Sequence, residues 1–172
     1  MKAASMPKRT PSNRGFTLIE MMVAIAVATI LSMIAVPSFR NASLSSQLRS
    51  SANDFVASTN FARSEAIKRG SAVTMCVSAD GSSCAAGGWE QGWIVLSGTT
   101  VLQHESAAPS GFKMSATGNV ASLSFQPIGV GATAATLIVC RATPTVGSQE
   151  RVVTLDATGR AWLRITTNGV CS

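Results

Sequence analysis

The sequence predicts an α+β protein in which one long N-terminal helix packs, by its second half, on an antiparallel β-sheet. Three observations predict this class. Residues 16–36 are an apolar run that contains one charge. Residues 44–66 carry apolar side chains at intervals of three and four, which is the period of one helix face. After Gly70 the apolar period changes to two, which indicates strands, and clusters of Gly, Ser, Pro and Asn separate the runs.

The apolar run is long enough to cross a membrane, because a helix over residues 16–36 spans about 31 Å. The segment before it holds no acid and four cations: Lys2, Lys8, Arg9 and Arg14. This flank predicts a cytoplasmic N-terminus and a translocated remainder. The rest of the chain contains ten basic and eight acidic residues, so most of the +6 net charge belongs to this N-terminal segment. An ordinary secretory signal fits less well, because the run continues to Val36-Pro37 without a good cleavage site.

Glu20 is the unusual residue of the run. A carboxylate inside an apolar helix costs several kcal/mol unless it is paired, so it is a functional candidate. Cleavage between Gly15 and Phe16 would create an α-amino group one helical turn away. We expect that amine, or the amine of a neighbouring subunit, to pair with Glu20. The alternative is a carboxylate that reaches the membrane interface without a specific role.

The helical pattern resumes after Pro37 as an amphipathic helix that Gly70 is expected to cap. The predicted helix runs from Phe16 to Arg69 over about 80 Å, with an interruption near Pro37. Its apolar face comprises Leu44, Leu48, Ala52, Phe55, Thr59, Ala62 and Ala66. The predicted strands are 72–77, 92–96, 100–103, 112–115, 121–125, 136–141, 151–155 and 160–165, and the last two form a hairpin around residues 156–159.

The four cysteines predict disulfides rather than a metal site. No CxxC pair occurs and His104 is the only histidine, so zinc has too few ligands. An even cysteine count behind an export segment indicates two disulfides in an oxidising compartment. Pairing in sequence order, Cys76–Cys84 and Cys140–Cys171, is the simplest of three connectivities and would contribute about 2.5 and 3.5 kcal/mol. The alternative is four buried free thiols.

No pattern predicts catalysis or a cofactor, so we expect neither an enzyme nor a metal protein. His104 has no nucleophile pattern nearby, and the glycines at 129 and 131 do not precede a phosphate-binding signature. Trp89 and Trp93 are expected to serve in core or rim packing.

One strand carries a face that could bind an anion. Alternate residues of a strand share a face, so Arg160, Trp162 and Arg164 should point one way. Ala161, Leu163 and Ile165 should then point into the core. Arginines neutralise phosphates and a base can stack on an indole, which suggests a nucleic-acid surface. Arg151, Arg141 and Lys113 could extend it. The alternative is a solvated strand face with Trp162 at a contact between subunits.

The segment Arg14-Gly15-Phe16-Thr17-Leu18-Ile19-Glu20 resembles the processing site of type IV pilins and type II secretion pseudopilins. The resemblance implies the type IV pilin fold, cleavage after Gly15 by a prepilin peptidase, and methylation of the Phe16 amine. It also implies that Glu20 meets the N-terminus of an adjacent pilin and that Pro37 kinks the helix. The leader would cover residues 1–15, or ten residues if Met6 is the start.

The later segments 61–69 and 88–95, Leu123-Ser124-Phe125 with Gly129, and Gly159-Arg160 resemble the GspH/FimT branch of minor pilins and pseudopilins. This resemblance implies a leader (1–15), a transmembrane and assembly helix (16–37), an amphipathic helix (38–70) and a head domain (71–172). The implied location is the inner membrane, with a single pass and a periplasmic head, and later the pilus fibre. The implied partners are major and other minor pilins, the prepilin peptidase and the inner-membrane assembly platform.

The implied function is that of a minor type IV pilin with a structural and priming role. A GspH-type pseudopilin of a type II secretion system and a dedicated DNA receptor are the alternatives. Gly159 and Arg160 also resemble the start of the Gly-Arg-x-Arg motif with which FimT-like pilins of transformable bacteria bind double-stranded DNA. Here Trp162 replaces the second Arg of the motif, and the next cation is Arg164.

Overall fold

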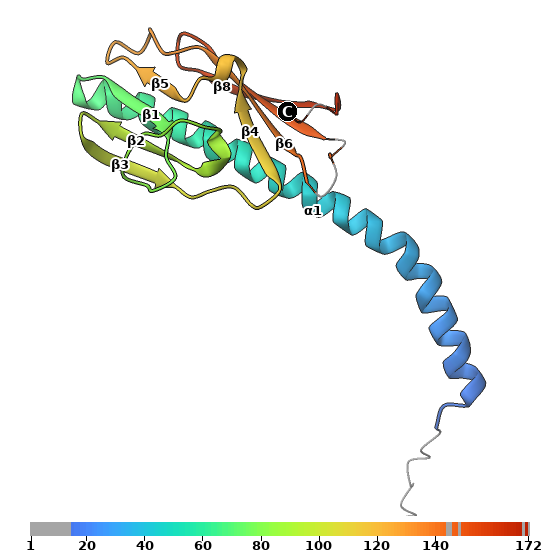
Figure 1. Cartoon of the computed structure of the whole chain (residues 1–172). Coiled ribbons are helices and arrows are strands. Elements are labelled where there is room, and N and C mark those ends of the chain that lie inside the picture. Colours follow the sequence, from blue (N-terminus) through green and yellow to red (C-terminus); the bar gives the residue numbers. More distant parts are fainter. Residues whose placement is uncertain (1–14, 144–145, 148, 170, 172) are drawn as a thin grey trace, which may run out of the picture. The chain divides into compact units, whose positions relative to one another are not determined.

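The computed structural model describes residues 15–143, 146–147, 149–169 and 171. It confirms the predicted α+β class (Figure 1). The chain divides into two compact units, residues 1–42 and residues 43–172, which are described separately below; residues 43–172 are called the head unit. The elements are α1 (Leu18–Arg69), β1 (Val73–Val77), η1 (Trp89–Gln91), β2 (Trp93–Ser97), β3 (Thr100–Glu105), β4 (Phe112–Ala116), η2 (Thr117–Asn119), β5 (Ser122–Phe125), β6 (Ala135–Arg141), β7 (Glu150–Leu155) and β8 (Ala161–Thr166).

The first unit contains the N-terminal part of α1, whose apolar side chains are exposed along its length. Within the described ranges, α1 is the one helix long and apolar enough to cross a membrane. The predicted interruption at Pro37 is wrong as a break in the helix, since the residues on both sides remain helical. Pro37 has no N–H, so the carbonyl of Met33 lacks its usual partner four residues later.

The head unit contains two four-stranded antiparallel sheets where the sequence predicted one. Their strand orders are β3-β2-β1-β5 and β4-β6-β7-β8. All eight strands lie within two residues of their predicted bounds. The alternation of apolar residues marks strands but does not choose their partners. Here β4 pairs with β6 instead of β3, and β5 returns to β1, so the strands separate into two groups.

The core of the head unit combines the apolar face of α1 with the inner faces of both sheets. Leu48, Ala52, Phe55 and Ala62 are buried on α1, as their spacing predicts. Residues from both sheets join the same cluster, including Val73, Met75, Leu123, Met114, Val139 and Leu155. Because this cluster and all four cysteines lie within residues 43–172, the head unit has the core and cross-links that independent folding requires.

Two buried tryptophans fix the position of α1 on the sheets. The Phe55 ring packs edge-on against Trp89 and Trp93, with centroids 5.1 and 5.6 Å apart. Trp89 Nε1 donates a hydrogen bond to the Val120 carbonyl at 2.8 Å, and Trp93 Nε1 donates to the Ser58 hydroxyl at 3.0 Å. Both indoles therefore have partners for their N–H groups, as buried tryptophans require. The packing interpretation of Trp89 and Trp93 is confirmed.

Candidate functional site

Glu20 lies at the start of α1 and is bonded to Thr17, the residue before the helix begins. The Glu20 backbone N–H donates to Thr17 Oγ1 at 3.3 Å, and the Thr17 backbone N–H donates to Glu20 Oε2 at 3.5 Å. This reciprocal pair is a capping box, which satisfies two backbone donors that a helix start leaves free. The carboxylate also lies at the positive end of the helix dipole. Thr17 is therefore a hydrogen-bond partner of Glu20 within the same chain. The sequence analysis missed this partner, although the Thr-x-x-Glu spacing indicates it.

Gly15 and Phe16 precede α1 and have no regular secondary structure. Among the described residues, no atom other than those of Gly15 and its chain neighbours lies within 4 Å of a Cβ placed on Gly15, and Phe16 is 79% exposed. The peptide bond between them is therefore outside the helix and open to solvent, which is the state in which a protease can bind a chain. The basic residues of the leader and Met6 lie outside the described residues.

Trp162 and Arg164 alternate along β8 and are exposed on its outer side, and Arg160, the residue before the strand begins, is exposed as well. Trp162 is 50% exposed and lies opposite Thr154 of β7, while Arg164 lies opposite Val152. We call these three residues the basic strand face. β8 is an edge strand of its sheet, so its outer backbone edge has no neighbouring strand among the described elements. The exposed indole and guanidinium groups that the candidate nucleic-acid surface requires are therefore present in the structure.

Arg151 does not extend the basic strand face, contrary to the prediction. It lies opposite Ile165, so its side chain points to the inner side of the sheet, where it is 3% exposed. Its guanidinium donates to the Ser45 hydroxyl of α1 at 2.9 Å and to the Glu150 carbonyl at 3.1 Å. Burial lowers the pKa of this guanidinium, and the charge of Arg49 lowers it further. The Arg151 side chain therefore links β7 to α1 by a hydrogen bond and is not available to a ligand on the outer side of the sheet.

Arg141 and Lys113 also lie apart from the basic strand face. Arg141 pairs with Phe112 and so belongs to the inner side of β6, against the prediction. Lys113 is exposed and shares the outer side, but it lies on β4, three strands from β8, which is roughly 14 Å. Ile165 was predicted to point into the core, but its side chain is exposed. It is 63% exposed, because the edge strand has a neighbour on one side only.

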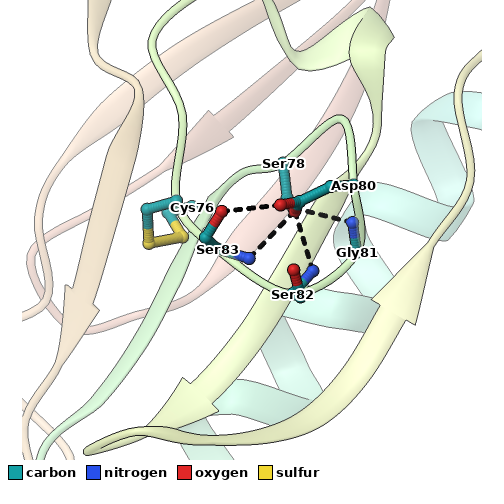
Figure 2. Close-up of a disulfide and its surroundings, with 7 residues drawn as sticks. Cys76, Ser78, Asp80, Gly81, Ser82 and Ser83 are labelled. Carbon is teal, nitrogen blue, oxygen red and sulfur yellow. Dashed lines mark hydrogen bonds between the residues drawn. A yellow bond between two sulfur atoms is a disulfide. The ribbon is translucent and has the colours of Figure 1, made fainter.

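The structure contains the two disulfides in sequence order, Cys76–Cys84 and Cys140–Cys171. Figure 2 shows the first of them beside a short loop held by Asp80. Asp80 Oδ1 accepts hydrogen bonds from the backbone N–H groups of Ser82 and Ser83, both at 2.9 Å, and Oδ2 accepts from the Ser83 hydroxyl at 2.7 Å. These donors hold the pKa of Asp80 far below its usual range. The His104 ring lies against Gly81 of the same loop.

A second aspartate shapes the β7–β8 turn. Asp156 Oδ1 accepts from the Thr158 hydroxyl at 2.6 Å, the Thr158 N–H at 2.8 Å and the Arg160 N–H at 3.0 Å. The Thr158 hydroxyl is the largest cause of the lowered pKa of Asp156, followed by the Arg160 N–H. This turn holds the backbone of Arg160, after which β8 begins at Ala161.

These two aspartates predict how the head unit responds to acid. A carboxyl whose pKa is lower in the folded state stabilises the fold above its unfolded pKa and loses that contribution as pH falls. The unfolded pKa of Asp is about 3.9. We therefore expect constant stability from these groups between about pH 5 and 7, and a decline below about pH 4.

Urea unfolding of Asp80→Asn at several pH values should show a shallower decline in the free energy of unfolding than the wild type. Asp54→Asn is the control, since Asp54 accepts one long hydrogen bond, from Ser50 at 3.4 Å; an equal effect of both variants would contradict this assignment.

Within the described residues, no group of three or more His, Cys, Asp or Glu side chains is arranged to hold a metal ion.

Comparisons with known proteins agree with this geometry. Residues 51–159 match the sequence model of the family "Type II transport protein GspH", and residues 10–36 match the prokaryotic N-terminal methylation motif. No curated protein shows significant sequence similarity to the chain.

Solved structures that superpose with a TM-score above 0.5 share the fold. The type IV minor pilin FimU of Pseudomonas aeruginosa superposes with a TM-score of 0.56 at 22% identity, covering 69% of this chain and 89% of that one. Its second crystal form gives a TM-score of 0.51 at 22% identity, over 68% and 92%. The minor pseudopilin EpsH of the Vibrio cholerae type 2 secretion system gives 0.49 at 17% identity, over 72% and 99%. With the family match over residues 51–159, which is more than half of the chain, and the N-terminal methylation motif within residues 10–36, the chain belongs to the family of the type II transport protein GspH.

Proposed function

We propose that this protein is a minor type IV pilin, a structural and priming subunit that is anchored in the inner membrane and then built into a pilus. The observation that carries the proposal is the arrangement of residues 15–36. The Gly15–Phe16 peptide bond is exposed. It is followed within one turn by the Glu20 carboxylate, which takes part in the capping box, and then by an exposed apolar helix. A membrane and, after extraction, neighbouring helices are the surroundings that such a helix needs.

Glu20 is the proposed assembly residue. Cleavage after Gly15 leaves an ammonium group on Phe16, which methylation keeps charged. The capping box survives the cut because the Phe16–Thr17 peptide bond stays intact. In this state the carboxylate is held at the helix start, where it can accept the ammonium of an adjacent subunit. Attraction between opposite charges is strongest where water is excluded, so the pair selects the axial position of the incoming helix.

The proposed topology follows from the charges around the helix. The basic leader stays in the cytoplasm, residues 16–37 cross the membrane once, and the amphipathic helix (38–70) and head domain (71–172) lie in the periplasm. That compartment is oxidising, in accord with the two disulfides. The proposed partners are the prepilin peptidase, the inner-membrane assembly platform, and the major and other minor pilins. Pro37 removes one helix bond and would allow the helix to bend where packing requires it.

The test separates a pilus from a type II secretion system, in which a GspH-type pseudopilin would serve. The gene is deleted in its host, and surface pili and secreted proteins are both quantified. Loss of most pili, restored by the wild-type gene, together with detection of the chain in sheared filaments, supports the proposal. Retention of secreted proteins in the periplasm with normal pili would assign the chain to secretion, and no change in either would contradict assembly of any filament.

Binding of double-stranded DNA is a second candidate function, which the shared exposure of Arg160, Trp162 and Arg164 favours. Two guanidinium groups flank an indole on one face, so they can neutralise phosphates while the indole contacts a sugar or base. A dedicated DNA receptor would then lose transformation without losing pili.

We expect the head unit to retard duplex DNA at low salt, and Arg160→Gln/Arg164→Gln to weaken binding at least about tenfold and to reduce the salt slope by about two. Lys68→Gln/Arg69→Gln removes the same charge from the end of α1 and is the control. Retardation by the Arg160/Arg164 variant equal to that of the wild type would exclude this surface.

A further inference from the structure

The strands at the edges of the two sheets differ in how their outer backbone groups are satisfied. An edge strand offers unpaired N–H and C=O groups to any extended chain, and proteins protect such edges with bulges, covering segments or side chains. The edges of the head unit are β3 and β5 in one sheet and β4 and β8 in the other. The first three are protected, and β8 is not.

Side chains and a connecting segment protect β4 and β5. On β4, the Met114 N–H donates to Glu90 Oε2 at 3.1 Å. On β5, the Ser124 N–H donates to Thr133 Oγ1 at 3.1 Å, and the Ser124 carbonyl accepts the Thr133 N–H at 3.0 Å. These contacts occupy edge groups that an added strand would need.

A bulge protects β3. Val95 of β2 pairs with Gln103, and the next residue, Leu96, pairs with Val101. Leu102 is therefore an extra residue on β3, and such a residue bends a strand and interrupts its regular edge.

β8 pairs with β7 in one unbroken register along its whole length. In the turn before it, the Asp156 N–H donates to the Arg160 carbonyl at 3.1 Å, so hydrogen-bonded pairs recur at every second residue, at Trp162 and Arg164. The residues between these pairs direct their N–H and C=O groups away from β7, and they are Ala161, Leu163 and Ile165. Among the described residues, no contact with another segment occupies these groups, which we call the open edge.

The side chains beside the open edge select the chemistry of an added strand. Arg164 and Trp162 are exposed on the outer side of β8. On the inner side, Leu163 is half-buried and Ile165 is exposed. Because directly opposite residues of neighbouring strands interact, a fitting strand carries negative charge on its outer side and apolar side chains on its inner side.

The acidic groups near β8 do not cancel this preference. Glu150 is buried, and its Oε2 accepts the Thr166 hydroxyl at 2.9 Å. Asp156 Oδ1 is occupied by its three hydrogen bonds within the turn. The fully exposed charges of residues 160–166 are those of Arg160 and Arg164, and both are positive.

We propose that the open edge binds an extended segment of another protein, in which acidic and apolar residues alternate, by adding it to the sheet as an antiparallel strand. The backbone of that segment bonds the free groups of β8, its acidic side chains meet Arg164, and its apolar side chains cover Ile165. A second β8 does not fit, because two copies paired edge to edge would place their arginines on one face. This binding goes beyond filament assembly and concerns the head unit alone.

The test titrates isotopically labelled head unit with a capped synthetic peptide of alternating glutamate and valine, as long as β8. The amide resonances of residues 161–166 should shift on binding. In the antiparallel pair, valines lie opposite Leu163 and Ile165 and direct their N–H groups to β8, whereas the glutamate N–H groups point away. Methylation of the valine nitrogens should therefore weaken binding at least about tenfold, and methylation of the glutamate nitrogens should change it little.

Two protein variants separate the backbone contribution from the charge. Ile165→Pro removes a free edge N–H without removing a bond to β7, and it should weaken peptide binding at least about tenfold. Arg160→Gln/Arg164→Gln should weaken it by a similar factor and remove most of its salt dependence. A peptide with lysine in place of glutamate is the control and should not bind.

The outcomes distinguish strand addition from the other proposals. Ile165→Pro should retard duplex DNA as the wild type does, because the DNA surface uses the side chains of Arg160, Trp162 and Arg164. Resonance shifts confined to other strands, equal binding of the two methylated peptides, or normal peptide binding by Ile165→Pro would each overturn strand addition. The methylated peptides test the same bonds on unaltered protein. None of these results bears on cleavage or on the membrane helix, so failure here is separable from failure of the proposed function.

Discussion

Glu20→Gln in the full chain should remove the protein from filaments while leaving its insertion and cleavage intact. The amide is nearly isosteric with the carboxylate, but it carries no charge for the ammonium of an adjacent subunit. Removing one partner of a buried ion pair costs about 3–5 kcal/mol because the other charge is left unpaired. Recovery in sheared filaments, measured against the membrane pool, should therefore fall at least about a hundredfold.

Ser32→Ala is the matched control in the same helix. Its hydroxyl bonds the Ala28 carbonyl at 2.8 Å within the helix, so its removal should not change incorporation. Thr17→Val tests the contribution of the capping box, since it keeps the β-branched shape and removes the hydroxyl that accepts the Glu20 N–H. We expect a smaller loss than for Glu20→Gln. Normal incorporation of Glu20→Gln would contradict the assembly role.

Phe55→Ala should destabilise the head unit more than any polar change described above. The ring is 3% exposed and lies against both Trp89 and Trp93, so its removal leaves a cavity where three rings meet. Such a truncation costs about 3–5 kcal/mol. For a domain of this size, the Tm should fall by roughly 10–20 °C.

Differential scanning calorimetry of residues 43–172 measures this loss. Asn60 lies on the exposed face of the same helix, so Asn60→Ala should shift the Tm little. Phe55→Leu refills part of the cavity and should lie between the two. A Tm shift for Phe55→Ala no larger than that of Asn60→Ala would mean that α1 does not pack on the sheets as described.

The helix and the strands could be predicted from the sequence because each has its own local period. Leu48, Ala52, Phe55 and Ala62 recur at helical spacing and are buried together. The two sheets could not be predicted, because strand pairing is decided by contacts between residues distant in sequence. The pairing of β5 with β1, for example, joins Val73 to Phe125.

The candidate binding surface shows the same limit. Alternation along β8 correctly placed Trp162 and Arg164 on one exposed face, whereas Arg160 precedes the strand. It could not place Arg151, because both Val152 and Val153 are apolar and the alternation of that strand does not say which face is inward. The register with Ile165 decides this, and it puts Arg151 against α1. A cation in a core is rare enough that sequence reasoning favours the surface.

Thr17 was missed for a different reason. Its role depends on where the helix begins, and the apolar run alone suggested a start at Phe16. The structure begins the helix at Leu18, which makes Thr17 the cap and brings Glu20 to the position from which its carboxylate reaches back. The acid that seemed isolated in the sequence is thereby held at the helix start.

Mass spectrometry of the mature N-terminus, on protein recovered from sheared filaments, tests the central claim most directly. The account predicts a chain that begins at Phe16 and carries one added methyl group on its amine. A filament subunit that still begins at Met1 or Met6, or one cut at any bond other than Gly15–Phe16, would contradict it.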